Sequence, residues 1–253
     1  MRKRITAKLA AAALLLLVIG MIYYFLTGFF GNPISAAIAG YKIKGYVQEK
    51  YPDKDLNVSN PEYNFKSGSY YSVIQSKTIK DMRFYVSYKK GKFNDSFEHD
   101  VTGGYMTYCR LASEFDSKVE DIIKSSFKHK SEIVIADFIV RNDDFSMLTL
   151  DMPLDIENPP FDAYLTVYIL TDEISYEALA ARLLELSNLM QDSNIPISLY
   201  SLVIEEASQE GDKAAVVGNA LHLFDFPAEK LQSNDLLAAI KEHIAEYEAK
   251  NPK

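Results

Sequence analysis

The period of apolar and polar positions changes along this chain, and each period predicts a different kind of element. No charged residue occurs between Leu9 and Phe30. At about 1.5 Å per helical residue this run reaches roughly 33 Å, enough to cross a bilayer core of about 30 Å. Aromatic side chains crowd its second half, where amphipathic rings suit the lipid headgroup level. We therefore expect a transmembrane anchor over residues 9–30.

The basic residues beside this run predict its orientation. Residues 1–8 carry several basic side chains and no acid, whereas only Lys42 and Lys44 precede the first carboxylate on the other side, at Glu49. The denser positive cluster favours a cytoplasmic N-terminus and translocation of the C-terminal part. The predicted location is the cell membrane, with a single pass and an extracytoplasmic C-terminal part.

A cleaved export signal is the alternative interpretation. Residues 37–39 (Ala-Ile-Ala) before Gly40 have the small-x-small form that signal peptidase recognises. The apolar run, however, exceeds the roughly 7–15 residues of secretory signals. Asn32-Pro33 predicts the start of a second helix, which cleavage after Ala39 would divide. We expect Ile34 and Ile38 to be buried in that helix, so a chain starting at Gly40 should lose stability.

Residues 52–97 show the alternation typical of strands. Pro52 ends the helix, and residues 66–68 (Lys-Ser-Gly) and Lys90-Gly91 are turn signals. Strands are expected over residues 63–65, 69–75, 82–88 and 92–97. They predict a meander of three or four antiparallel strands.

Beyond Gly103-Gly104 the spacing becomes helical and then alternates again. Apolar residues from Tyr108 to Phe127 mark one face of a long amphipathic helix. Strands are expected over residues 133–140, 147–150, 161–170, 197–205 and 214–224, with a turn at 209–212. Helices are expected over residues 175–190, capped near Asp172, and from a cap at Ser233 or Asn234 to Ala249.

This order of elements predicts an α+β fold class. We expect an N-terminal transmembrane helix followed by two small α+β lobes with antiparallel sheets, the second ferredoxin-like. The predicted domains are a cytoplasmic basic flank (1–8), the anchor (9–30), an α-β-β-β(-β)-α extracytoplasmic domain (31–130) and a C-terminal α+β domain (131–253).

Charge and cysteine content narrow the class of partner. The net charge is −8, and it is more negative still beyond the basic flank. Such a surface repels nucleic acid and anionic headgroups, so we expect neither as a ligand. The single cysteine, Cys109, excludes an internal disulfide framework and fits a bacterial envelope that relies little on disulfides.

No residue cluster has a recognisable chemistry. The four histidines are far apart, and no HExxH or Cys/His cluster occurs. No serine lies in a G-x-S-x-G or S-x-x-K motif. The acidic clusters at residues 142–144 and 151–157 lack the glycine-turned loop of a calcium site. We therefore expect no catalytic residue, no metal and no cofactor.

Tyrosine enrichment is the one feature that points toward binding. The chain has 17 tyrosines and no tryptophan. Strand propensity explains much of this bias, but alternation prevents all of the tyrosines from lying in a core. Exposed tyrosines on a sheet offer rigid contact area for proteins or glycans. The candidate binding residues are Tyr63, Tyr70, Tyr71, Tyr85 and Tyr88.

The segments GNPISAAIAGYKIKGYVQEKYPDKDLNV, YNFKSGSYYSVI and MRFYVSY carry a family resemblance. They resemble the YfjL-like group of uncharacterised Bacillus-type proteins, chiefly over residues 31–90, with a looser likeness over 161–206. The N-terminal half is also similar to the α-β-β-β modules of PepSY type. The resemblance implies a membrane-anchored, extracytoplasmic architecture in a Gram-positive bacterium. It transfers no catalytic residue.

Three functional hypotheses follow from these features. The first is an extracytoplasmic interaction module that binds an envelope protein or a wall polymer, held to the membrane by its N-terminal helix. The alternatives are a hydrolase-type enzyme whose site has no motif, and a structural spacer. A deep cleft with convergent titratable groups favours the enzyme, and a shallow sheet face with clustered tyrosines favours the interaction module.

Overall fold

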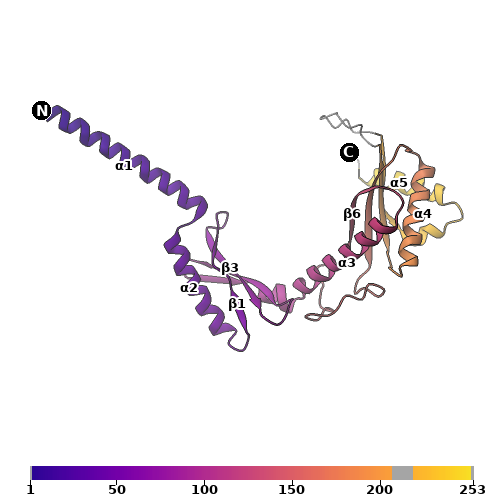
Figure 1. The fold of residues 1–253 in the computed structure, drawn as a ribbon, viewed down its shortest axis with the longest axis horizontal. Helices are drawn as coiled ribbons and strands as arrows, with labels where there is room; N and C mark the ends of the chain where they lie inside the picture. Colours follow the sequence, from indigo (N-terminus) through magenta and orange to yellow (C-terminus); the bar gives the residue numbers. More distant parts are fainter. Residues whose placement is uncertain (1, 207–218, 252–253) are drawn as a thin grey trace. The chain divides into compact units, whose positions relative to one another are not determined.

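The computed structural model describes residues 2–206 and 219–251 (Figure 1). The turn predicted at 209–212 and the first part of the strand predicted over 214–224 lie outside these residues. Contacts divide the chain into two compact units, Met1–Met106 and Thr107–Lys253. The helix after Gly104, predicted to belong to a domain that ends at residue 130, groups almost entirely with the second unit.

Helix α1 (Arg2–Phe30) contains the apolar run. Among the described residues, one helical segment is long and apolar enough to cross a membrane, and its most apolar window is not buried inside the protein. The side chains from Leu14 to Leu17 are each more than half exposed. A helix that is apolar on all sides and unburied suits a lipid environment. The predicted apolar helix is confirmed.

The chain passes from α1 to α2 (Pro33–Lys50) through Gly31 and Asn32. Asn32 caps α2, because its side-chain oxygen accepts hydrogen bonds from the backbone N–H groups of Ile34 and Ser35 (2.8 and 3.2 Å). A proline occupies the first helical position, where its missing N–H leaves no bond unmade. The predicted helix start is confirmed.

Five strands form an antiparallel sheet in the first unit. They are β1 (Leu56–Val58), β2 (Glu62–Asn64), β3 (Ser69–Ser76), β4 (Arg83–Lys89) and β5 (Lys92–Asp95). Both β1 and β2 pair with β3, and β4 lies between β3 and β5. The sheet thus extends the predicted meander by β1. A short π-helix, Glu98–Thr102, follows.

Helix α2 covers one face of this sheet. Ile43 and Val47 of the helix pack in one core with Ile74, Phe84 and Val86 of the strands, and none of the five is more than 3% exposed. The strand residues alternate along β3 and β4 as the sequence predicted.

One expectation about α2 is wrong. Ile34 and Ile38 are 72% and 51% exposed, so neither lies in the core. The buried stripe of α2 starts at Ala39 and continues through Ile43 and Val47, on another side of the helix. A chain starting at Gly40 therefore loses the cap and first turns of α2 without losing a large buried side chain.

The second unit contains a four-stranded sheet and three α-helices. Its elements are α3 (Tyr105–Ser126), β6 (Ser131–Phe138), β7 (Ala163–Leu170), α4 (Tyr176–Asp192), β8 (Leu199–Glu205), β9 (Ala220–Pro227), a 3-10 helix (Ala228–Gln232) and α5 (Leu236–Lys250). The strand order is β6-β7-β8-β9.

The predicted α+β class with two sheet-containing lobes is confirmed, but the second sheet is mixed. β7 and β8 are parallel, because α4 connects them as a crossover, while the two outer pairs are antiparallel. In a ferredoxin-like split β-α-β arrangement another strand separates the two parallel strands. Here they are direct neighbours, so the predicted ferredoxin-like order is corrected.

One face of this sheet and the three helices enclose a single core. The register places Val134, Val167 and Leu202 side by side on that face. Helices α3 and α4 contribute Phe115 and Leu183, which are fully buried in the same cluster. The amphipathic pattern predicted for α3 is thus satisfied within this unit.

The strand predicted over residues 147–150 is a loop. Asn142 and Asp143 have positive φ angles of 56° and 52°, which interrupt extended backbone before this segment. Phe145 and Leu148 then insert into the core at a spacing of three, while Met147 stays 58% exposed. The apolar run reflects two core contacts and not the alternation of a strand.

The caps of α4 and α5 also differ from the predicted residues. Ser175, not Asp172, caps α4 by accepting from the N–H of Ala178 (3.0 Å). Asp235 caps α5 by accepting from the N–H of Ala238 (2.9 Å). Each helix begins one to three residues later than expected, because a polar residue nearer to the helix makes the cap.

Candidate functional site

The five candidate tyrosines lie on both faces of the first sheet. The register pairs Tyr63 with Tyr70 and Tyr70 with Tyr88, so these three share the face that α2 covers. Tyr71 and Tyr85 belong to the opposite, open face, since successive strand residues point to opposite sides. Two of the five predicted residues, Tyr71 and Tyr85, therefore lie together on an accessible surface. The other three lie on the face that α2 covers.

Tyr71 and Tyr85 form a fixed aromatic pair on the open face. Their ring centroids are 6.2 Å apart, and Tyr85 is 41% exposed. The hydroxyl of Tyr71 donates to the carboxylate of Glu62 (2.6 Å), and this hydrogen bond, followed by partial burial, raises the pKa of Tyr71. The hydrogen bond to Glu62 thus restrains the ring of Tyr71, and the ring of Tyr85 lies beside it.

Tyr63 and Tyr70 belong to the joint between α1 and the sheet. The hydroxyl of Tyr70 accepts from the N–H of Asn32 (2.6 Å) and donates to the Asn32 carbonyl (3.1 Å). Gly31 has a φ of 74°, and a Cβ there would lie 2.7 Å from the ring of Tyr63. Only glycine tolerates both this backbone angle and this contact, so the joint is closely packed.

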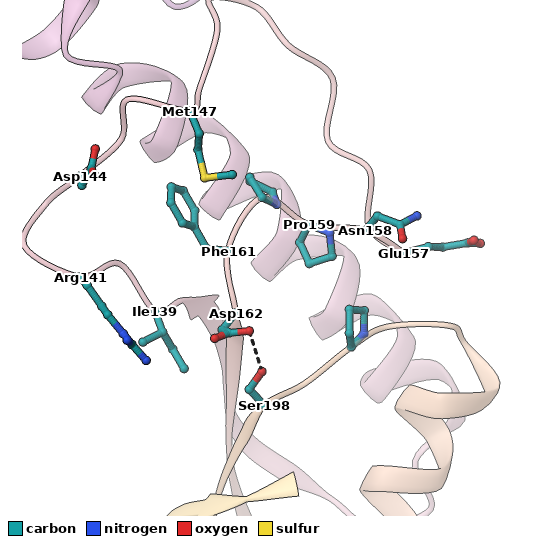
Figure 2. Close-up of a pocket in the computed structure, with 12 residues that line it drawn as sticks. Ile139, Arg141, Asp144, Met147, Glu157, Asn158, Pro159, Phe161, Asp162 and Ser198 are labelled. Carbon is teal, nitrogen blue, oxygen red and sulfur yellow. Dashed lines mark hydrogen bonds between the residues drawn. The ribbon is translucent and has the colours of Figure 1, made fainter. Parts of the chain in front are cut away.

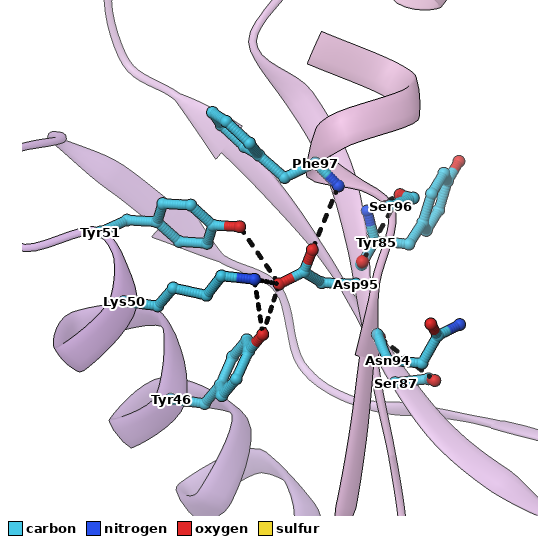
Figure 3. A network of polar contacts seen from close by, with 9 residues as sticks. All are labelled: Tyr46, Lys50, Tyr51, Tyr85, Ser87, Asn94, Asp95, Ser96 and Phe97. Carbon is cyan, nitrogen blue, oxygen red and sulfur yellow. Dashed lines mark hydrogen bonds and ion pairs between the residues drawn. The ribbon is translucent and has the colours of Figure 1, made fainter. Parts of the chain in front are cut away.

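A buried carboxylate connects α2 to β5 (Figure 3). The side chain of Asp95 is 5% exposed, and its Oδ2 accepts from Lys50 Nζ (2.7 Å), Tyr46 (2.5 Å) and Tyr51 (3.1 Å). Its Oδ1 accepts from the backbone N–H of Phe97 (3.3 Å). Tyr46 also stacks on the ring of Phe93, with centroids 4.5 Å apart.

The pKa shifts and hydrogen bonds in this cluster indicate that Asp95 has a structural role. Burial raises the pKa of Asp95, but the hydrogen bonds from Lys50, Tyr46 and Tyr51 outweigh burial and lower it overall. Burial and the charge of Asp95 raise the pKa of Tyr51 to about 12. Both oxygens of the carboxylate are occupied by protein donors, which leaves little capacity for a ligand. The cluster fixes α2 against the sheet.

A cleft of about 710 Å³ opens in the second unit, a volume in the range of ligand-binding pockets (Figure 2). Its apolar walls are formed by Ile139, Met147, Pro159, Pro160, Phe161 and Pro196. Its polar groups are Arg141, Asp144, Glu157, Asn158, Asp162 and Ser198. Most come from the loop between β6 and β7, and two come from the segment before β8.

The polar groups of this cleft do not form a catalytic constellation. Ser198 donates to Asp162 (3.3 Å), and no histidine is among the lining residues, so the serine lacks a base that would activate it. Hydrogen bonds from Ser146 lower the pKa of Asp144, which is therefore ionised at neutral pH and unsuited to act as a general acid. The arrangement suits ligand binding.

The histidines and acidic residues form no metal centre in the described ranges. No group of three His, Cys, Asp or Glu side chains there converges on a position for an ion. His129 contacts Glu185 (2.8 Å), and His243 bonds the carbonyl of Phe224 (2.8 Å). Contacts within the second unit therefore account for the positions of both histidines.

Sequence reasoning missed the Asp95 cluster and the α1 joint. Asp95 was assigned only to a strand, and its partners Tyr46 and Lys50 lie far away in sequence. Their i,i+4 spacing on α2 was a usable signal, because it places both side chains on one side of the helix. Nothing in the local pattern identified the carboxylate that they share.

Comparison with known families assigns both units. Residues 6–101 match the family described as YfjL-like, N-terminal domain, and residues 114–241 match the YfjL-like C-terminal domain. No match was found among curated proteins. No solved structure matched either.

Proposed function

The chain belongs to the YfjL-like family. Because of this membership and the geometry of the first unit, we propose that the protein is a membrane-anchored interaction module. Helix α1 spans the cell membrane of a Gram-positive bacterium once, with its N-terminus in the cytoplasm. The part of the first unit that follows α1 and the whole second unit lie outside the cytoplasm, where the first sheet binds an envelope protein or a wall polymer.

The open tyrosine pair is the observation that carries the proposal. Tyr71 and Tyr85 offer aromatic area on a sheet face opposite α2, and Glu62 holds Tyr71 in place. Arg83 and Gln75 extend this face with exposed polar groups, as their register with each other indicates. Aromatic rings bordered by hydrogen-bonding groups are typical of surfaces that bind proteins and glycans.

Retention of the anchor is supported by the burial of the alternative cleavage site. Ala39 is fully buried and Gly40 is also buried, both within the continuous helix α2. A Cβ on Gly40 would lie 3.2 Å from Pro61, so the backbone here is packed closely. Cleavage after Ala39 would divide α2 and remove its cap and its first turns from the packed unit.

We expect the double variant Tyr71→Ala/Tyr85→Ala to bind its partner at least about tenfold more weakly, because each truncation removes an aromatic anchor. The measurement is the affinity of the full-length chain, in detergent micelles, for purified wall polymer and for solubilised envelope proteins. Tyr41→Ala is the matched control, since Tyr41 is 78% exposed in the same unit but lies on α2.

The outcomes separate the three functional hypotheses. Equal binding by the double variant and the wild type contradicts a role for the tyrosine face. A loss seen only in Arg141→Ala assigns binding to the cleft of the second unit, whose volume is the observation that favours a small-ligand or enzymatic function. A wild-type chain that binds neither polymer nor protein indicates a structural spacer.

A further inference from the structure

Four lysines gather at one end of the first sheet. Lys66 lies in the turn between β2 and β3, and Lys89, Lys90 and Lys92 surround the turn between β4 and β5. Both turns lie at the same end, because β3 and β4 are antiparallel neighbours and Tyr70 at the start of β3 pairs with Tyr88 at the end of β4. We call this group the lysine end.

The two turns contact each other, and no carboxylate in the described ranges neutralises their lysines. Lys89 donates from Nζ to the carbonyl of Ser67, which joins the turns directly. All four lysines are exposed. Within the described ranges, none of them forms an ion pair with a carboxylate. The positive charge is therefore not neutralised inside the unit.

The lysine end lies beside the last turns of α1. Phe65, next to Lys66, is 56% exposed, and its ring centroid is 6.1 Å from that of Phe29 in α1. A shallow space of about 410 Å³ between this turn and α1 is lined by Phe65 and by Tyr24, Phe25, Thr27, Gly28 and Phe29. The hydrogen bonds between Asn32 and Tyr70 fix the neighbouring backbone. The turn is thus attached where the apolar helix ends.

The local charge is opposite to that of the whole chain. The net charge of the protein is −8, yet between Glu62 and Asp95 the only acidic residue is Asp81, which is 2% exposed and lies at the other end of the sheet. The net negative charge predicted that the chain repels anionic headgroups. The net charge of the whole chain does not show that the lysines gather at one end of the first sheet.

We propose that the lysine end binds anionic phospholipid headgroups, with the ring of Phe65 inserted at the level of the acyl-chain boundary. The inference rests on the proposed membrane span, because the end of α1 then sets the lysine end at the bilayer surface. Near an anionic surface each lysine raises affinity about fivefold. An aromatic ring between basic residues is suited to the same interface.

The absence of tryptophan makes a direct test available, since Phe65→Trp introduces the only tryptophan of the chain. The full-length variant is reconstituted into phosphatidylcholine vesicles with increasing phosphatidylglycerol, and the acyl chains carry bromine as a quencher. We expect quenching that rises about twofold with phosphatidylglycerol. Replacing all four lysines with glutamine should remove this dependence, while Lys77→Gln/Arg83→Gln, toward the other end of the sheet, should preserve it.

Two further variants keep the test decisive. Ser67→Trp provides a second reporter in the same turn that leaves all four lysines in place, in case Phe65→Trp disturbs packing on Phe29. Tyr85→Trp lies five residues from the turn, roughly 17 Å along the strand, and should stay unquenched. Quenching in both turn reporters that is equal with and without phosphatidylglycerol overturns the proposal, and so does quenching that survives the fourfold glutamine variant.

The same preparation distinguishes failure of this inference from failure of the proposed function. A chain that alkaline carbonate extracts from the vesicles does not span the bilayer, which overturns both. A chain that stays in the membrane while the turn reporters remain unquenched overturns only the lipid contact. If the four lysines instead govern binding of soluble anionic wall polymer and leave quenching unchanged, the lysine end binds that polymer and the lipid proposal is wrong.

Discussion

Substituting arginine for both Leu15 and Leu16 is expected to release the protein from the membrane. These side chains lie in the apolar part of α1 and are 60% and 69% exposed within the protein, so lipid is the environment that they would lose. An arginine near the centre of a spanning helix costs about 2.5–3.5 kcal/mol, and two cost roughly 5–7 kcal/mol. The measurement is the fraction of chain that resists alkaline carbonate extraction in cells.

Alanine at the same two positions provides the control. Leu15→Ala/Leu16→Ala keeps the helix uncharged and should remain in the membrane fraction. Carbonate-resistant arginine variants would place the membrane attachment outside α1. A mature N-terminus at Gly40 in wild-type material would show that the apolar run is a cleaved signal.

Asp95→Ala is expected to cause a large loss of folding stability in the first unit. It leaves the hydroxyls of Tyr46 and Tyr51 and the ammonium of Lys50 without their shared acceptor. Because Lys50 is 47% exposed and regains water, we expect about 2–4 kcal/mol, below the full cost of breaking a wholly buried pair. Urea denaturation of the full-length chain in micelles measures the loss.

The pH dependence of stability provides a second readout. The folded pKa of Asp95 is below the ordinary value of 3.8, so its contribution to stability is complete above that value and is lost as the pH falls through the folded pKa. The raised pKa of Tyr51, about 12, acts oppositely, and its contribution is lost as the pH rises from 10 toward 12. Asp95→Asn should flatten the acidic side of the profile.

Asp55→Asn is the matched control for Asp95. Asp55 pairs with Lys77 at 2.6 Å, but the two side chains are 64% and 49% exposed. An exposed ion pair contributes about 0–1 kcal/mol, so this variant should unfold nearly like the wild type. Equal destabilisation by the two substitutions would contradict the structural role of the Asp95 cluster.

Local patterns predicted the elements whose neighbours are near in sequence. Alternation in residues 82–88 identified β4, because Phe84 and Val86 face the core. Asn32-Pro33 identified the start of α2, because the cap is made within three residues.

Contacts between distant residues were not predictable in this way. The carboxylate of Asp95 meets Lys50 across 45 positions, and no local pattern specifies that pair. The parallel pairing of β7 and β8 follows from the crossover through α4, whereas the strand patterns alone fit either direction. Alternation along the strands predicted that the five tyrosines do not all share one face, and the register shows which of them lie together: Tyr71 and Tyr85 on one face, and Tyr63, Tyr70 and Tyr88 on the other.

Protease accessibility in intact protoplasts tests the central claim most directly. If α1 is a retained anchor and the chain beyond it lies outside the cytoplasm, protease added to intact protoplasts should digest residues 34–253 and leave a small protected fragment containing α1. Full protection of the C-terminal part until the protoplasts are lysed would contradict this topology and, with it, the proposed extracytoplasmic role.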